Sequence, residues 1–169
     1  RGVPRPAAGA YSEEGAGSQV TRILAIAAAV LLLVAAPAGL WADLAKAKAE
    51  PNLERRARLA LENATLQLRL ASQADRSGDW AKTKEALAEL GESVDLAYAS
   101  LKQTGKNASK SPKHFKRAEL NGRKLLRRLD TLIQDLSVED RDPAEKARAR
   151  VRKVQEALLA DIMGGGRRR

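Results

Sequence analysis

The sequence has no cysteine, one histidine and only five aromatic residues among its 169 residues. Without cysteine, the chain can form neither a disulfide bond nor a thiolate metal site. One histidine, with no carboxylates at metal-ligand spacing, leaves zinc or di-iron chemistry without enough ligands. Five aromatic side chains are also too few for the rows of base-stacking platforms that single-strand nucleic-acid binders use. We therefore expect an aliphatic core, no metal ion and no cofactor.

The first 42 residues differ in composition from the rest of the chain. Residues 1–19 are rich in Gly, Ala and Pro without apolar periodicity, which is typical of a disordered or non-native upstream segment. Residues 20–42 contain one basic residue near their start, Arg22, and no charge after it. A short basic start followed by an apolar stretch such as residues 23–36 is typical of a secretory signal peptide.

Two other interpretations of residues 20–42 stay open. Residues 23–42 match the roughly 20 residues that span a bilayer, so an uncleaved membrane anchor is the second interpretation and an ordinary buried helix is the third. Pro37 and Gly39, and the lack of basic residues directly after the segment, favour cleavage. A signal peptide or an anchor would place the rest of the chain outside the cytoplasm. We therefore expect an exported protein of the periplasm or cell envelope, or one anchored in the inner membrane with its helices outside the cytoplasm.

Four later segments place apolar side chains at alternating intervals of three and four residues. This spacing predicts amphipathic helices over residues 52–76, 80–101, 112–136 and 143–162. The positions expected to face the core are Leu53, Ala57, Leu61, Ala64, Leu68 and Ala71; Trp80, Thr83, Leu87, Leu90, Val94, Ala97 and Leu101; Phe115, Ala118, Gly122, Leu125, Leu129, Leu132 and Leu136; and Ala144, Ala147, Val151, Val154, Leu158 and Ile162.

Turn and cap residues mark where these helices begin and end. Gly78 and Gly105 stop the first and the second helix. Ser111 is the expected N-cap of the third helix, with Pro112 at its first position. Asp142 is the expected N-cap of the fourth helix, followed by a proline and a glutamate that completes a capping box.

The repeat of 3.5 residues lets helices pack at a shallow angle around a shared seam, and short loops make consecutive helices antiparallel. We therefore predict an all-α fold, an antiparallel up-down four-helix bundle over residues 52–163. Residues 43–51 would be a linker before it, and residues 164–169 a flexible Gly/Arg tail. The alternative is a three-helix core whose first helix continues from the membrane segment.

Positive charge is concentrated in the middle of the chain. Residues 102–128 contain ten Lys and Arg residues against a single acid, Glu119. The predicted start of the third helix carries several of these cations, although the positive end of the helix dipole disfavours them. Free amide donors at such a start favour an anionic ligand. The predicted anion-binding residues are Lys113, His114, Lys116, Arg117, Arg123, Lys124 and Arg127. A solvated basic face without a ligand is the alternative interpretation.

The second predicted helix has an acidic outer face. Its carboxylates avoid the apolar stripe and are Glu85, Glu89, Glu92 and Asp95. An acidic helix beside a basic helix favours self-association or an acidic protein partner, because complementary charges attract across an interface. Solubility is the alternative explanation of both faces.

Two resemblances concern the fold alone. The first predicted helical hairpin, which contains Ala74, Gly78-Asp79-Trp80 and Ala86-Leu87, resembles a tetratricopeptide helix pair. No second copy follows at the period of about 34 residues. Three further motifs are Ser111-Pro112-Lys113-His114-Phe115-Lys116-Arg117, Leu125-Leu126-Arg127-Arg128-Leu129 and Leu158-Leu159-Ala160-Asp161-Ile162-Met163. Through them the chain from residue 20 onward resembles uncharacterised exported bacterial proteins with a signal peptide and a small helical bundle. This resemblance implies no activity.

No group of residues in the sequence indicates catalysis. The single histidine has no adjacent acid or nucleophile with which it would form an activated pair. The pattern favours a non-enzymatic cell-envelope protein whose basic surface binds an anionic envelope polymer, a membrane surface or an acidic protein. Nucleic-acid binding is the alternative, which the charge supports and the export signal and scarce aromatic residues oppose.

We predict that the protein exported by a host with signal peptidase begins near Asp43. The charge-free segment ends with Pro37, Gly39 and the small residue Ala42, which suit a cleavage site. The N-terminal mass of the exported protein measures this. Retention of residues 23–42 in a membrane fraction that resists high salt would instead identify an anchor.

Overall fold

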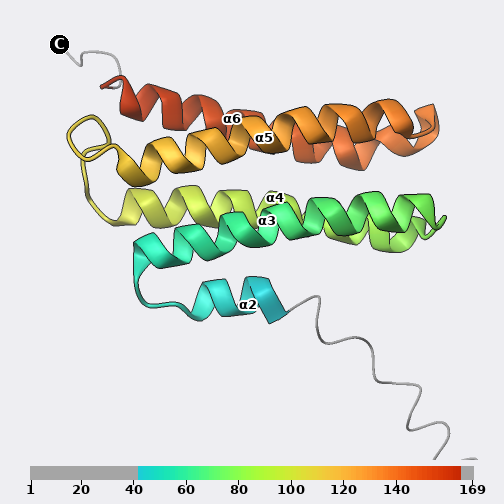
Figure 1. The fold of residues 1–169 in the computed structure, drawn as a ribbon, viewed down its shortest axis with the longest axis horizontal. Helices are drawn as coiled ribbons and strands as arrows, with labels where there is room; N and C mark the ends of the chain where they lie inside the picture. The colour runs from blue at the N-terminus through green and yellow to red at the C-terminus, as the bar shows by residue number, and fades with distance from the viewer. Residues whose placement is uncertain (1–41, 165–169) are drawn as a thin grey trace, which may run out of the picture. The chain divides into compact units, whose positions relative to one another are not determined.

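The computed structural model describes residues 42–164, which form α-helices, one short 3-10 helix and no β-strand. This confirms the all-α fold class. The elements (Figure 1) are α2 (Ala42–Ala49), α3 (Leu53–Arg76), α4 (Trp80–Gln103), α5 (Lys113–Asp135), η1 (Val138–Asp140) and α6 (Arg141–Ile162). The predicted upstream segment, almost all of the predicted signal peptide or anchor, and most of the predicted tail lie outside the described residues. No helix in the described part has both the length and the apolar character needed to cross a membrane.

The first two long helices begin and end as their sequence predicts. Asn52 caps α3, because its side-chain oxygen accepts a hydrogen bond from the Arg55 amide at 2.9 Å. Gly78 has a φ of 72°, a left-handed conformation that glycine adopts at little cost, and it turns the chain out of α3. Asp79 then caps α4 by accepting a hydrogen bond from the Lys82 amide at 3.1 Å.

The starts of α5 and α6 differ from the prediction. Ser111 does not cap α5, which begins directly after Pro112 without any side-chain cap. The expected N-cap Asp142 lies inside α6, because this helix already begins at Arg141 after η1. Pro143 fits into the first turn of α6, since the first four amide groups of a helix have no intrahelical acceptor and a missing N–H removes no bond there.

The long helices form two hairpins, α3 with α4 and α5 with α6, and each helix runs opposite to the one before it (Figure 1). Between the hairpins, α4 packs against α6 and α3 against α5, whereas α4 and α5 make only marginal contact. The segment between α4 and α5 therefore connects helices that are not immediate neighbours. As a consequence, α3 and α5 run parallel, with their N-termini at the same end of the structure (Figure 1).

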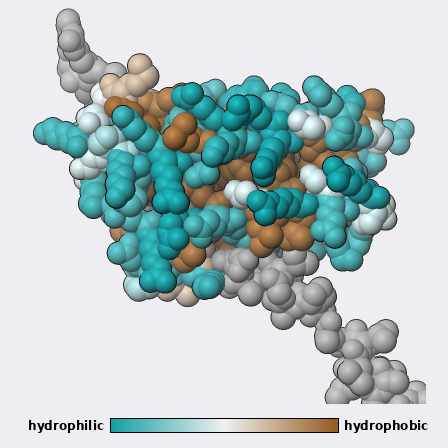
Figure 2. Space-filling view, viewed as in Figure 1, coloured by the Kyte–Doolittle hydropathy of each residue, from teal (hydrophilic) through white to brown (hydrophobic). Residues whose placement is uncertain are grey.

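The core is aliphatic, and the predicted inward positions occupy it. Every such position of α5 is buried, including Leu129, which has no exposed surface. Leu90 is equally buried in α4. Only Leu53, Trp80 and Ile162 are partly exposed, because they lie at helix ends. With the apolar side chains inside, the face drawn in Figure 2 is mostly hydrophilic.

Small residues control how closely the helices approach. The most extensive helix contact joins α3 to α4, and α3 buries Ala57, Ala60, Ala64 and Ala71. Alanine side chains allow a short distance between helix axes because little volume separates the backbones. The α3–α4 hairpin is consequently the tightest part of the structure.

One glycine of α4 makes room for a side chain of α6. A Cβ atom added to Gly91 of α4 would lie 2.9 Å from the guanidinium of Arg150, so glycine leaves room for this side chain. Arg150 crosses there and donates to the carboxylate of Asp95 at 3.0 Å. Gly122 of α5 faces Gln155, whose side chain would lie 3.4 Å from an added Cβ atom, which is an ordinary contact distance.

The structure corrects the prediction of a linker over residues 43–51, because most of this segment is the helix α2. Leu44 and Ala47 lie three residues apart on one face of α2 and are both buried. The helix packs against α3 and α4, and Lys48 forms an ion pair with Glu92 of α4 at 3.7 Å. Two apolar positions are too few to establish a periodicity, so the pattern did not reveal this helix.

We predict that Leu90→Asp and Leu129→Asp unfold the protein, whereas Lys124→Asp leaves it folded. Both leucines are fully buried, and an unpaired carboxylate in a core costs several kcal/mol. Lys124 is exposed on the same helix as Leu129. Circular dichroism melts of the three variants test this. Equal melting of Leu129→Asp and Lys124→Asp would contradict the orientation of α5.

Candidate functional site

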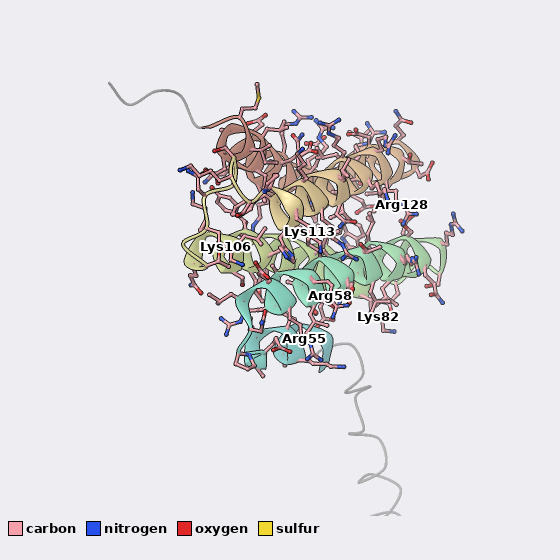
Figure 3. All side chains as sticks on the ribbon, turned by 60° about the vertical axis from the view of Figure 1, so that its left-hand side comes forward. Arg55, Arg58, Lys82, Lys106, Lys113 and Arg128 are labelled. Carbon is pink, nitrogen blue, oxygen red and sulfur yellow. The ribbon has the colours of Figure 1, made fainter. Side chains whose placement is uncertain are left out.

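Most of the predicted anion-binding residues lie on the solvent side of α5. The exposed ones are Lys113, Lys116, Arg117, Arg123, Lys124 and Arg127, and His114 is half-buried. Glu119 is the only acid between residues 113 and 128, and it is 4% exposed. The outer surface of this part of α5, which runs from Lys113 to Arg128 in Figure 3, therefore presents positive charge and no exposed carboxylate. That this surface binds an anion stays a prediction.

The exposed cations differ in how they are paired. Lys113, Lys116, Lys124 and Arg127 form no ion pair with another described residue. Arg123 instead pairs with Glu119, four residues earlier in α5. The amide of Gln155 in α6 also donates to Glu119, at 2.9 Å. Arg123 thus neutralises a buried carboxylate that connects α5 to α6, and only part of the predicted stripe is free to meet an external anion.

Glu54 supplies an anion at the start of α5 from within the chain. Its carboxylate accepts a hydrogen bond from the Lys106 amine at 2.6 Å and lies 3.2 Å from the His114 imidazole. Lys106 comes from the segment between α4 and α5, and it lies at the same end as Lys113 (Figure 3). The helix start that seemed to lack a counterion therefore has one, because the parallel packing brings the first turn of α3 beside it.

The electrostatics of Glu54 reflect these partners. The hydrogen bond from Lys106 is the largest cause that lowers the pKa of this carboxyl below its ordinary value of 4.5, and burial opposes it. The charges of His114 and Lys113 lower the pKa further. Glu54 also lies in the first turn of α3, where the helix dipole favours a negative charge. The carboxylate is consequently ionised at neutral pH.

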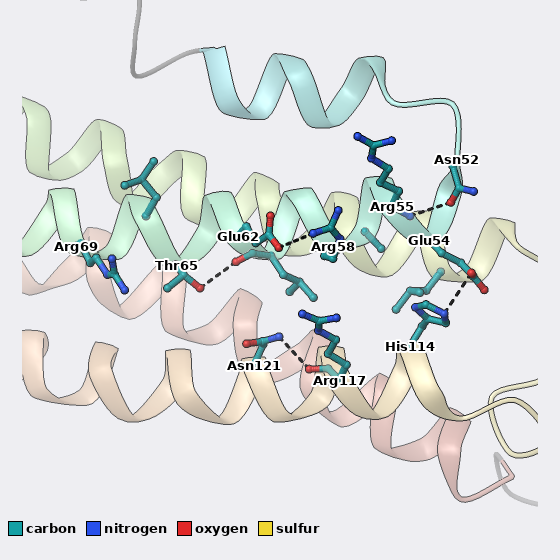
Figure 4. Close-up of a pocket in the computed structure, with 14 residues that line it drawn as sticks. Asn52, Glu54, Arg55, Arg58, Glu62, Thr65, Arg69, His114, Arg117 and Asn121 are labelled. Carbon is teal, nitrogen blue, oxygen red and sulfur yellow. Dashed lines mark hydrogen bonds and ion pairs between the residues drawn. The ribbon is translucent and has the colours of Figure 1, made fainter.

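A cleft of about 630 Å³ lies between α3 and α5, next to this cluster (Figure 4). Arg117 extends from α5 toward α3, where Arg58 and Glu62 form an ion pair of 3.2 Å. Leu61 and Leu101, both buried, provide apolar surface in the cleft. The volume falls within the range of about 300–1,000 Å³ that is usual for small-molecule sites.

The cleft contains more arginine than its carboxylates neutralise. The arginines that line it are Arg55, Arg58, Arg69 and Arg117. Arg55 pairs with Glu50 at 3.0 Å, whereas neither Arg69 nor Arg117 forms an ion pair among residues 42–164. A guanidinium binds carboxylate and phosphate oxygens in a planar, bidentate geometry. The arrangement can hold an anionic group, and among the described residues no cluster of three or more potential ligands could hold a metal ion.

Arg117 is one of the predicted anion-binding residues, whereas the arginines of α3 are not. Arg58, Glu62, Thr65 and Arg69 follow one another at intervals of four, three and four residues, beside the apolar stripe. This spacing places them on one edge of a helix, which is a usable signal. This edge did not stand out in the sequence because α3 has an excess of only two basic residues over acidic ones. Which helix this edge faces depends on tertiary packing.

Three of the four carboxylates on the acidic outer face predicted for α4 have partners within the protein, and one of them is buried. Glu89 is 8% exposed, which corrects its placement on the outer surface, and it accepts a hydrogen bond from Asn63 of α3 at 2.8 Å. Glu92 pairs with α2 and Asp95 with Arg150 of α6. These intramolecular pairs involve three of the four carboxylates, and self-association or an acidic partner stays a prediction.

We predict that the Glu54 contacts stabilise the fold above pH 5 and fade in acid. A carboxyl whose pKa is lower in the folded state stabilises that state above its unfolded pKa, and the contribution is lost as pH falls through the folded pKa. Glu54→Gln should therefore melt earlier than the unsubstituted protein at pH 7, by at most about 1 kcal/mol because the pair is partly solvated. The difference should shrink as the pH falls through the pKa of the folded state.

Thermal melts across this pH range measure the effect. Glu156→Gln is the matched control, because Glu156 is exposed and forms no ion pair in the described part. A pH-independent difference between Glu54→Gln and the unsubstituted protein would contradict the ionic role of Glu54.

Comparison with known proteins finds no matching family model, no similar curated protein and no similar solved structure. The function is therefore inferred from the residues and their geometry.

Proposed function

We propose that this protein is a non-enzymatic, exported protein of the cell envelope that binds an anionic envelope component through the outer face of α5. In this proposal, residues 20–42 direct export and α3 to α6 form a four-helix bundle. The packing of the α3–α4 hairpin against the α5–α6 hairpin supports the bundle. The bundle serves as a rigid support that holds the basic face in one orientation.

The observation that carries the proposal is the one-sided charge of α5. Between residues 113 and 128, every exposed ionisable residue is Lys or Arg, and the single acid is buried. At a rise of 1.5 Å per residue, the cations from Lys113 to Arg127 extend over about 21 Å. A ligand with a single negative charge would meet only part of this surface. A polymer or a surface with repeated negative charges can contact several of these cations at once.

The cleft between α3 and α5 extends this basic surface. Arg117 belongs to both, since it is exposed on α5 and also lines the cleft. Arg69 adds a second guanidinium without an ion pair in the described part. A negatively charged side group of the bound polymer would be held there by bidentate hydrogen bonds.

Nucleic acid fits this surface less well than an envelope polymer. Phe115, the only aromatic residue of α5, is 2% exposed and so offers no stacking platform. An acidic protein is a further partner that the same charges would attract. Both enter the experiment below as additional ligands.

We predict that heparin and anionic vesicles bind the cleaved protein that begins near Asp43, whereas a neutral polysaccharide and neutral vesicles do not. Binding should weaken between 0.1 M and 1 M salt, because the Debye length falls from about 10 Å to about 3 Å. Combined reversal of three unpaired lysines, Lys113→Glu, Lys116→Glu and Lys124→Glu, should remove most of the binding. Single-stranded DNA and polyglutamate, measured in parallel, distinguish the alternative partners.

A matched triple variant controls for the net charge. Lys46→Glu, Arg152→Glu and Lys153→Glu change the charge by the same amount at exposed positions that form no ion pair in the described part. This control should retain most of the affinity. If both triple variants lose binding equally, the attraction comes from net charge and the proposed surface does not exist.

A further inference from the structure

Leu120 is an exposed hydrophobic residue in the middle of the basic face. Its exposed fraction is 54%, although it lies within the regular helix α5. Among the described residues, the other exposed large hydrophobic ones are Val138 in η1 and Met163 after the end of α6. Leu120 thus differs from them in its position, which is neither a turn nor a helix end.

Cations surround Leu120 on the helix surface. Lys116 and Arg117 precede it by four and three residues, and Arg123 and Lys124 follow it by three and four. Residues at these spacings are nearest neighbours on one face of an α-helix. All four are exposed, and Arg123 also pairs with the buried Glu119, so cations flank the leucine on both sides along the helix.

We infer that α5 lies on an anionic lipid surface, with Leu120 inserted among the acyl chains and the surrounding cations on the lipid headgroups. This inference rests on the proposed function and names its ligand. Lys and Arg near a membrane are attracted by anionic headgroups, and an apolar side chain adds affinity by leaving water. Between residues 113 and 128, α5 itself has no exposed carboxylate that the headgroups would repel.

The effect of Leu120 on binding distinguishes a lipid surface from a soluble polyanion as the ligand. A highly charged polysaccharide provides no apolar phase, so an exposed leucine gains nothing when the surrounding lysines bind it. A bilayer provides such a phase directly beneath its charged headgroups. Membrane binding should therefore depend on Leu120 and on the cations, whereas polysaccharide binding should depend on the cations alone.

The experiment compares Leu120→Gln with Leu120→Met and with the unsubstituted full chain. Glutamine keeps a high helix propensity, and the position is exposed, so folding should persist and circular dichroism checks it. Binding is measured by co-sedimentation with vesicles of phosphatidylglycerol and phosphatidylcholine, with vesicles of phosphatidylcholine alone, and by affinity for heparin. Every variant shares residues 1–41, so their contribution cancels in the comparison.

We predict that Leu120→Gln weakens binding to the anionic vesicles about fivefold, because roughly half of a leucine side chain is available for burial. Heparin affinity should stay unchanged, and Leu120→Met should bind vesicles like the unsubstituted protein. Val138→Gln, which removes an exposed valine outside α5, should have no effect on either ligand.

Two results would overturn the lipid inference. Equal vesicle binding by Leu120→Gln and the unsubstituted protein would show that the leucine does not enter a bilayer. An equal loss of vesicle and heparin binding would show that the substitution disturbs the basic face itself. Neither result decides the proposed function, because that depends on the triple lysine reversal and its matched control.

Discussion

The close packing of α3 against α4 is the constraint on which the rest of the structure depends. Alanines along α3 let the two helices approach more closely than leucines would, and this pair makes the most extensive contact between elements. Helix α2 packs on this hairpin through Leu44 and Ala47. On α4, Gly91 gives Arg150 of α6 access to Asp95, so the second hairpin is also positioned by it.

The contact between α3 and α5 is less extensive, and this difference has functional consequences. The two helices run parallel, so their first turns meet, and Glu54 pairs with Lys106 and contacts His114. Farther along, looser packing leaves the cleft in which Arg69 and Arg117 lie without ion pairs among the described residues. The same topology thus satisfies one group of charges and leaves another group available to a ligand.

Helix α5 has two faces with different tasks. Its inner face buries large residues such as Leu125 and Leu129, and this burial fixes the rotation of the helix. Because the inner face is fixed, the lysines and arginines must face solvent, and Leu120 must lie among them. The buried Glu119 forms an ion pair with Arg123 and accepts a hydrogen bond from Gln155. Because Glu119 is buried, no acid is exposed between residues 113 and 128. A surface of this kind suits an anionic ligand with many charges.

The sequence alone determined the four long helices, most of their inward positions and the exposed cations of α5, but not the short helix α2. These features depend on local periodicity, turn residues and the cost of burying charge, all of which are visible within a few turns of one helix. Tertiary structure decided the rest. Glu54 accepts a hydrogen bond from Lys106, which lies 52 residues later in the sequence. The buried Glu89 accepts a hydrogen bond from Asn63, which lies on another helix. Which charges are paired depends on which helices become neighbours, and a helical repeat has the same form whichever neighbour it faces.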